Sequence, residues 1–232
     1  TSESNAAFGY NFEGALQQYV LMDERVVVDP RRDESFLIPA AEGPSCSATA
    51  LVEPWACVES SYINEERNSI LAGGRLLVVA DRNRQVLDLE SSFAPAGNPG
   101  EIVVISGEEV PIADLAYERA ADIAGLPAEH FDDIVYFGSR REVIEQLDSK
   151  LAARGICNIV LGGEQIGAPV SVSVGRVHYG MTRWIGTPSG NASESYAAIP
   201  ANGEIRPDDR ATVIGAGGPM GQMHVIRLLA AK

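Results

Sequence analysis

The chain has 232 residues, 45% of them hydrophobic, so it can bury the core of one large domain or two small ones. Its formal net charge of −14 argues against a nucleic-acid-binding surface, which would be basic. No run approaches the roughly 18 apolar residues of a membrane span. Three widely spaced cysteines without a Cys-x-x-Cys pair indicate core thiols in a reducing, cytoplasmic protein, although the start at Thr1 leaves an upstream signal open.

The first 75 residues have weak patterns. Residues 19–21 and 25–28 resemble short strands joined by a turn, and two prolines mark residues 36–45 as a loop. Residues 46–62 have a helical pattern, and Pro54 fits near a helix start because its missing N–H has no partner there. Gly73 and Gly74 end this region.

An alternation of strands and helices follows. Continuous apolar runs predict strands at 76–80, 102–106, 133–137 and 156–161, with further strands at 170–174 and 181–185. A helical turn fits 85–90. Longer helices are predicted over 111–125 and over 139–154, where Ser139 and Glu142 have the spacing of a capping box. Apolar strands that alternate with helices predict an α/β fold with a doubly wound parallel sheet.

The last segment has the strongest motif. Residues 211–214 (ATVI) read as a short strand, a glycine cluster follows, and a helical pattern opens at Gln222. A glycine turn between a strand and a helix predicts dinucleotide binding, because the backbone approaches the pyrophosphate closely and the helix N-terminus offers N–H donors. The three-glycine template fits Ala216, Gly218 and Gly221. The expected cofactor-binding residues are Gly215, Ala216, Gly217, Gly218, Pro219, Met220 and Gly221.

Three segments together resemble the medium-chain, zinc-type alcohol dehydrogenase superfamily, nearest its sorbitol-dehydrogenase-like members. They are the glycine-rich stretch 9–19, the segment ALVEPWAC (50–57) and the terminal VIGAGGPMG. The resemblance implies a Rossmann-like sheet preceded by the end of a GroES-like, β-rich catalytic domain. It also implies an NAD- or NADP-dependent dehydrogenase that acts on a small alcohol or polyol and forms a homo-oligomer.

The spacing of these segments departs from the family pattern. About 160 residues separate Glu53 from Gly215, whereas in the family the glycine turn follows soon after the Glu-Pro helix. We therefore expect an internal repeat. Its predicted parts are the end of the catalytic domain (1–57), a degenerate Rossmann-like domain (58–200) and the start of a second, dinucleotide-binding one (201–232).

The turn after the strand at 76–80 has no glycine and reads Asp81-Arg82-Asn83-Arg84. Side chains occupy the space where backbone would approach phosphate, so this copy should not bind a dinucleotide in the usual way. Two readings remain open: Arg82 or Arg84 pairs directly with a phosphate, or the segment is a surface charge cluster.

Glu53 is the candidate catalytic and metal-binding residue. The resemblance implies that it binds the catalytic zinc or its water, whereas the residue itself is equally suited to complement the helix dipole. The other expected ligands, a Cys and a Gly-His-Glu segment, would lie before Thr1, so the chain is expected to be a fragment, inactive by itself. The histidines His130, His178 and His224 offer no site of their own.

Two other functions compete with a zinc-dependent dehydrogenase. A zinc-free reductase of the same superfamily would keep the glycine turn without metal ligands, and a non-catalytic dinucleotide-binding or scaffolding protein would need no Glu53. The residue that selects NAD or NADP is expected roughly 20 residues beyond the turn, past Lys232.

Overall fold

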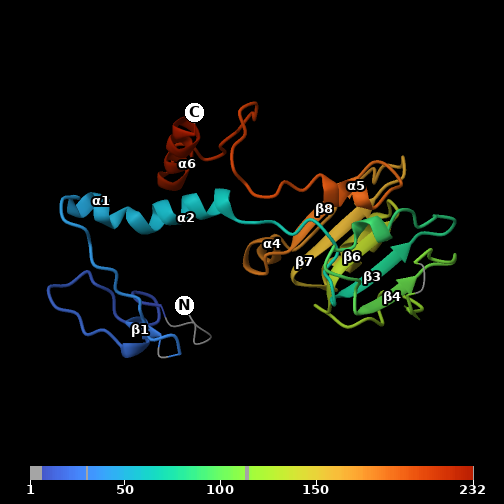
Figure 1. Ribbon diagram of the computed structural model, residues 1–232, viewed down its shortest axis with the longest axis horizontal. Coiled ribbons are helices and arrows are strands. Elements are labelled where there is room, and N and C mark those ends of the chain that lie inside the picture. The colour runs from blue at the N-terminus through green and yellow to red at the C-terminus, as the bar shows by residue number, and fades with distance from the viewer. Residues whose placement is uncertain (1–6, 30, 113–114, 232) are drawn as a thin grey trace. The chain divides into compact units, whose positions relative to one another are not determined.

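The computed structural model describes residues 7–29, 31–112 and 115–231. The chain divides into two compact units (Figure 1). The first unit combines Thr1–Ser60 with Arg210–Lys232, and the second unit is Ser61–Asp209. None of the helices in the described residues has the length and apolar character that crossing a bilayer requires.

The second unit is built on one parallel sheet. Its strands are β3 (Arg75–Ala80), β4 (Glu101–Ile105), β5 (Glu118–Arg119), β6 (Phe131–Phe137), β7 (Leu151–Val160) and β8 (Arg183–Thr187). They lie in the order β5-β4-β3-β6-β7-β8, and every neighbouring pair is parallel. Numbered from the first strand of this sheet, the order is 3-2-1-4-5-6, which is that of the Rossmann fold. The predicted fold class is confirmed.

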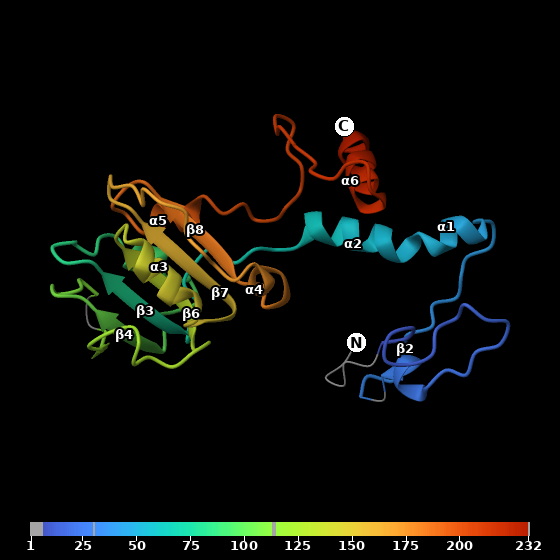
Figure 2. The same ribbon diagram turned by 180° about the vertical axis from the view of Figure 1, so that it is seen from behind.

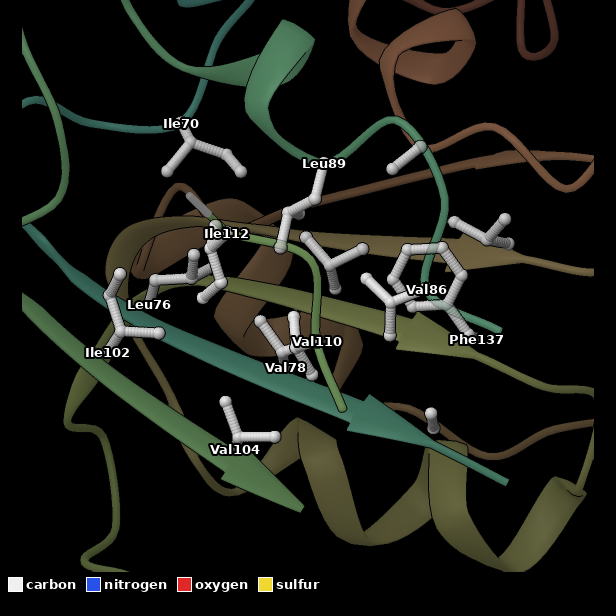
Figure 3. Packing of buried hydrophobic residues seen from close by; sticks show 14 of the residues in the cluster. Ile70, Leu76, Val78, Val86, Leu89, Ile102, Val104, Val110, Ile112 and Phe137 are labelled. Carbon is white, nitrogen blue, oxygen red and sulfur yellow. The ribbon is translucent and has the colours of Figure 1, made fainter. Parts of the chain in front are cut away.

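Side chains on the two faces of this sheet form two cores. Alternate residues point to opposite faces of a strand, so Leu76 and Val78 enter one core while Leu77 and Val79 enter the other. Figure 3 shows the first core, where residues of β3 and β4 pack under segments that connect the strands. The second core is covered by α3 (Arg141–Asp148), whereas α5 (Ser193–Ala197) covers the first. Both faces are therefore buried, as the apolar runs of the strands predict.

The predicted helix over 111–125 is wrong. Within its described residues the chain runs over the edge of the sheet, with Ile112 in the first core and Ile123 in the second. Between them, β5 pairs with Val103 and Val104. Burial on both faces of the sheet overrides the helical signal of the terminal proline and glycine.

Three further elements of the second unit differ from prediction. The helix expected over 139–154 ends at Asp148, because residues from Leu151 onward pair with β6 as β7, across an irregularity in register. Ser139 does not cap it: its hydroxyl donates to Glu164, 2.6 Å away, and the N-cap is Arg140. The strand expected at 170–174 is absent, and α4 (Val174–Tyr179) begins at its last residue. The turn expected at 85–90 forms later, as the 3-10 helix η2 (Glu90–Ser92).

A buried ion pair joins the amino end of β6 to the segment before β3. Both carboxylate oxygens of Asp133 accept from Arg67 Nη1, at 2.8 and 2.7 Å, and Asp133 is only 1% exposed. The backbone N–H of Leu71 and the hydroxyl of Tyr196 also donate to this carboxylate, at 2.9 and 3.2 Å. Burial nevertheless raises the pKa of Asp133 to about 6, against the opposing effect of Arg67.

The first unit has little regular structure before its helices. Residues 19–21 form no strand, and Tyr19 and Leu21 are exposed. Over 25–28 the chain instead forms the 3-10 helix η1 (Glu24–Val26), capped by Asp23, and then β1 (Val28–Asp29), which pairs with β2 (Glu34–Ser35). The helical region is α1 (Cys46–Ala50) and α2 (Val52–Ile63), with Pro54 in the first turn of α2, as predicted. The last helix, α6, spans Pro219–Ala230.

Candidate functional site

The glycine turn (Gly215–Gly221) ends at the start of α6. The N–H of Gly218 donates to the carbonyl of Gly215 at 3.0 Å, which closes a tight turn. Gly215 has φ +81°, a left-handed conformation that favours glycine. The helix follows immediately, with Pro219 in its first turn. The predicted helix after the turn is confirmed, but it begins at Pro219 rather than at Gln222, so the last residues of the glycine motif belong to the helix.

Gly221 brings the helix close to the turn. A Cβ at this position would collide with the carbonyl oxygen of Gly215, whereas a Cβ at Gly218 would meet the same oxygen at an ordinary 3.5 Å. The third glycine of the dinucleotide fingerprint serves close packing of this kind. The structure therefore requires glycine at positions 215 and 221, and leaves room for alanine at Gly218.

The turn and the first turn of α6 present unpaired donors. In the described part of the chain, the N–H groups of Ala216, Gly217, Met220 and Gly221 have no hydrogen-bond acceptor. The first turn of α6 contains no acidic residue that would compete for them. N–H groups at a helix N-terminus, together with the helix dipole, favour an anion such as a phosphate. Unpaired donors of this kind are what the predicted contact with a pyrophosphate requires.

The predicted strand before the turn is wrong. Residues 211–214 pair with no strand among the described residues, and Ile214 is 96% exposed. An extended segment becomes a stable strand only when neighbours take its hydrogen bonds and cover its side chains. The apolar sequence of the segment is therefore not sufficient to form a strand here.

Glu53 lies in the first turn of α2 and is exposed. Its Oε1 accepts a hydrogen bond from the Cys57 thiol, one turn along the helix, at 3.3 Å. This bond raises the pKa of Cys57, so the sulfur is a protonated thiol at neutral pH. Contrary to the expectation of core thiols, Cys46 and Cys57 are exposed, and only Cys157 is buried.

The described residues do not supply a zinc site. No group of three or more His, Cys, Asp or Glu side chains among them is arranged to hold a metal ion. Glu53 and Cys57 offer one oxygen and one sulfur, whereas structural zinc takes four protein ligands and catalytic zinc takes three. His178 lies at the end of α4 and His224 on α6, while His130 pairs with Glu101 at 3.1 Å.

An ion pair connects the helix of the glycine turn to the helix of Glu53. Arg227 Nε on α6 donates to Glu59 Oε2 on α2, at 2.9 Å, and the Arg227 side chain is 14% exposed. In both views α6 lies beside α2 (Figure 1 and Figure 2). Sequence reasoning missed this pair, although a basic residue in the last turn of a helix is a common favourable arrangement.

In the second unit, the turn after β3 is filled by its own side chains. The Arg84 guanidinium donates to the carbonyl oxygens of Gly162 and Val160, each at 3.4 Å, and lies 3.5 Å from the carboxylate of Glu164. A Cβ at Gly162 would collide with this guanidinium. The carboxyl end of β3, where a Rossmann fold receives a pyrophosphate, is therefore occupied by an arginine side chain. Arg82 is exposed beside it.

Two cavities lie elsewhere in the second unit. The larger, about 750 Å³, follows the edge strand β8 and includes Trp184, Ile185 and Ile199. The smaller, about 440 Å³, lies at the amino ends of β4 and β6, beside Glu101 and His130. Neither is lined by a predicted site residue.

The chain is similar to two curated proteins. It is 27% identical to L-sorbose 1-phosphate reductase from Klebsiella pneumoniae over 68% of the chain and 45% of the relative. It is 22% identical to the uncharacterized protein YggP from Escherichia coli over 91% of the chain and 57% of the relative. The chain thus spans about half the length of the curated relatives it matches. No family model matches it.

Among solved structures, an alcohol dehydrogenase zinc-binding domain protein from Burkholderia ambifaria aligns with a TM-score of 0.39 and 13% identity, over 83% of this chain and 48% of that one. The strand order and the similarity to L-sorbose 1-phosphate reductase bear out the predicted resemblance to medium-chain dehydrogenases and reductases.

Proposed function

We propose that the chain binds NAD or NADP through the glycine turn and belongs to an oxidoreductase that transfers hydride between the cofactor and the carbon of an alcohol or polyol. The observation that carries the proposal is the tight turn at the N-terminus of α6, with unpaired N–H groups at Ala216, Gly217, Met220 and Gly221. The curated relative named as a reductase supports the same reaction class.

In this proposal the residues of the chain bind and orient, and the nicotinamide supplies the hydride chemistry when it is bound. The turn holds the pyrophosphate at the N-terminus of α6, because the backbone approaches closely where Gly215 and Gly221 lack side chains. The remaining parts of the proposal are a small-molecule substrate, a cytoplasmic location and a homo-oligomeric assembly.

We also propose that the chain contains a duplicated nucleotide-binding fold. Residues 58–200 are the copy that has lost its glycine turn, residues 201–232 begin the copy that keeps it, and residues 1–57 end a GroES-like catalytic domain. The support is the Rossmann strand order of the second unit together with a second turn of the dinucleotide-binding type outside it.

Glu53 enters the proposal as a zinc ligand that needs partners outside the described residues. Its carboxylate is exposed and has one thiol beside it. If Glu53 binds zinc, Glu53→Gln should lower the zinc content of the purified chain after dialysis against zinc, while Glu42→Gln, an exposed carboxylate in a loop, should not. Equal zinc content in the two variants and the wild-type protein would remove Glu53 from the metal site.

A zinc-free reductase is the second candidate. It needs no metal ligand at Glu53, whose place in the first turn of α2 also suits a carboxylate that complements the helix dipole. Such an enzyme keeps dinucleotide binding and is indifferent to Glu53→Gln. A purely non-catalytic binding protein would also bind the cofactor, and would oxidise no alcohol or polyol in its presence.

The cofactor proposal is tested by fluorescence titration of the chain with NADH and NADPH. Gly221→Val places a side chain against the Gly215 carbonyl, so we expect loss of measurable affinity. Gly107→Val is the matched control, because it makes the same change outside the turn at a glycine whose Cβ would meet nothing within 4 Å, and it should bind within about threefold of the wild-type chain. Unaltered affinity in Gly221→Val, or no binding by the wild-type chain, would contradict the assignment.

A further inference from the structure

The glycine turn has few restraints of its own. Residues 211–214 before it form no strand, the residues 215–217 are exposed, and none of the described residues of α6 is fully buried. Glycine-rich backbone has more conformational freedom to lose than any other, so a turn of this kind needs specific contacts to keep one conformation.

One side chain supplies such a contact. Gln222, in the first turn of α6, folds back so that its Nε2 donates to the carbonyl oxygen of Gly217 at 2.9 Å. Its own backbone N–H donates to the carbonyl of Gly218 at 2.9 Å, which starts the helix. The Gly217–Gly218 peptide is held at both ends, because its N–H is already bonded to the Gly215 carbonyl at 3.0 Å.

This contact also affects the charge that the turn presents. A carbonyl oxygen carries partial negative charge and would repel a phosphate that approached it. With the Gly217 oxygen bonded to Gln222, the groups left without partners in this stretch include the N–H donors of Ala216 and Gly217. An anion that approaches the turn therefore meets N–H donors, and the nearby carbonyl oxygen of Gly217 already accepts a hydrogen bond from Gln222.

We propose that Gln222 is a positioning residue that fixes the Gly217–Gly218 peptide and thereby sets the affinity of the turn for the pyrophosphate of a dinucleotide. The inference rests on the proposed function, because it assigns a role at the same site. Gln222 acts through the turn and does not itself contact the ligand.

The test compares Gln222→Met with the wild-type chain. Methionine has nearly the same length and no donor, so it removes the bond to Gly217 and leaves the helix intact. Leu229→Met is the matched control, because it introduces the same side chain on α6 at an exposed position. A net hydrogen bond of ordinary strength corresponds to roughly fivefold in affinity, so Gln222→Met should raise the Kd for NADH and for ADP-ribose about fivefold.

A second ligand separates positioning from general damage to the fold. Adenosine has no phosphate, so its affinity should be the same in Gln222→Met and the wild-type chain. Equal weakening of adenosine and ADP-ribose would overturn the inference, as would an unchanged Kd for ADP-ribose. A shift for ADP-ribose in Leu229→Met would overturn it as well.

Hydrogen exchange distinguishes failure of this inference from failure of the proposed function. If the wild-type chain binds no dinucleotide, the proposed function fails and the assignment of pyrophosphate affinity fails with it. The structural part is then decided by the amide of Gly218, which should exchange several times faster in Gln222→Met if Gln222 holds the peptide. An unchanged exchange rate of the Gly218 amide would show that the bond from Gln222 does not restrain the Gly217–Gly218 peptide.

Discussion

The segments 76–84 and 211–221 begin with similar apolar runs and have opposite fates. In the first, LLVVA is the central strand β3, almost wholly buried between β4 and β6, but the turn after it is occupied by Arg84. In the second, ATVI pairs with nothing in the described residues, yet the turn after it is open and rich in donors. The residues that build the sheet and the residues that leave N–H donors unpaired at a turn thus lie in different segments.

The largest expected effect concerns the buried core around β3. Phe137 lies at the end of β6 and is fully buried in the first core, as Figure 3 shows. Phe137→Ala should lower the free energy of unfolding by about 3–5 kcal/mol, because it removes apolar contact and leaves a cavity. The matched change Ile214→Ala, at a 96% exposed side chain, should cost less than about 0.5 kcal/mol in urea denaturation. Comparable losses would mean that 211–214 is packed in solution.

The next effect concerns the ion pair that anchors β6. Arg67→Met leaves the Asp133 carboxylate buried without its charged partner, which should cost about 3 kcal/mol at neutral pH. Arg141→Met, which breaks the exposed pair with Glu145, is the control and should cost less than about 0.5 kcal/mol. If both variants unfold at the same urea concentration, the buried pair does not stabilise the second unit.

The same carboxylate gives a pH dependence of defined sign. Because burial raises the pKa of Asp133 to about 6 in the folded state, above the 3.8 of a free aspartate, the folded state holds this proton more tightly. Its contribution to the free energy of unfolding should therefore fall as pH rises from about 4 to about 6. In Asp133→Asn this contribution disappears, so unfolding curves of the two proteins at pH 4 and pH 7 should differ in their pH dependence. A parallel pH dependence in both proteins would contradict the raised pKa.

A smaller effect tests the glycine turn. Gly215→Ala puts a Cβ on a residue with φ +81°, which should destabilise the turn by about 1 kcal/mol and weaken NADH binding several-fold. Gly217→Ala is the comparison, because Gly217 has no positive φ and open space around it. Titrations that give the same Kd for both variants would show that the left-handed conformation is not needed for binding.

The smallest effect tests whether Arg84 is what closes the turn of the second unit. Arg84→Gly removes two long hydrogen bonds and a partly exposed ion pair, so the loss of stability should be within about 1 kcal/mol. With the side chain gone, the backbone after β3 becomes accessible. The measurement is NADH binding by Arg84→Gly in a Gly221→Val background. Binding would show that the Arg84 side chain alone blocks the turn after β3, and no binding would show that other residues also prevent it.

Much of the sheet could be predicted from the sequence, because strands buried on both faces must be continuously apolar. Runs such as 76–80 and 133–137 are typical of strands that are covered on both faces, and both runs are buried in this way in the structure. The helix expected over 111–125 failed because its ends were read from a proline and a glycine, while Ile112 and Ile123 are buried in different cores. The strand expected at 211–214 (ATVI) was also wrong, for a different reason. An apolar run favours a strand but does not show whether a neighbouring strand is present to pair with it.

The candidate site divides in the same way. The turn could be predicted from its glycines, because a positive φ at Gly215 and the close approach of the backbone at Gly221 exclude other residue types. The contacts of Gln222 with Gly217 and of Arg227 with Glu59 were not, because they depend on how a side chain folds back or on where a distant helix lies. The role of Glu53 stays a prediction, resting on a resemblance and one neighbouring thiol.

The unpaired N–H groups of the glycine turn belong to a chain with a net charge of −14. These donors and the net negative charge act on a phosphate over different distances. The donors act only at contact, whereas the surplus of carboxylates repels a phosphate from farther away, over roughly 10 Å at moderate salt. Added salt shortens that repulsion and leaves the donors unchanged. The association rate of a dinucleotide should therefore rise with ionic strength, the reverse of the behaviour of a basic protein that gathers phosphates by its overall charge.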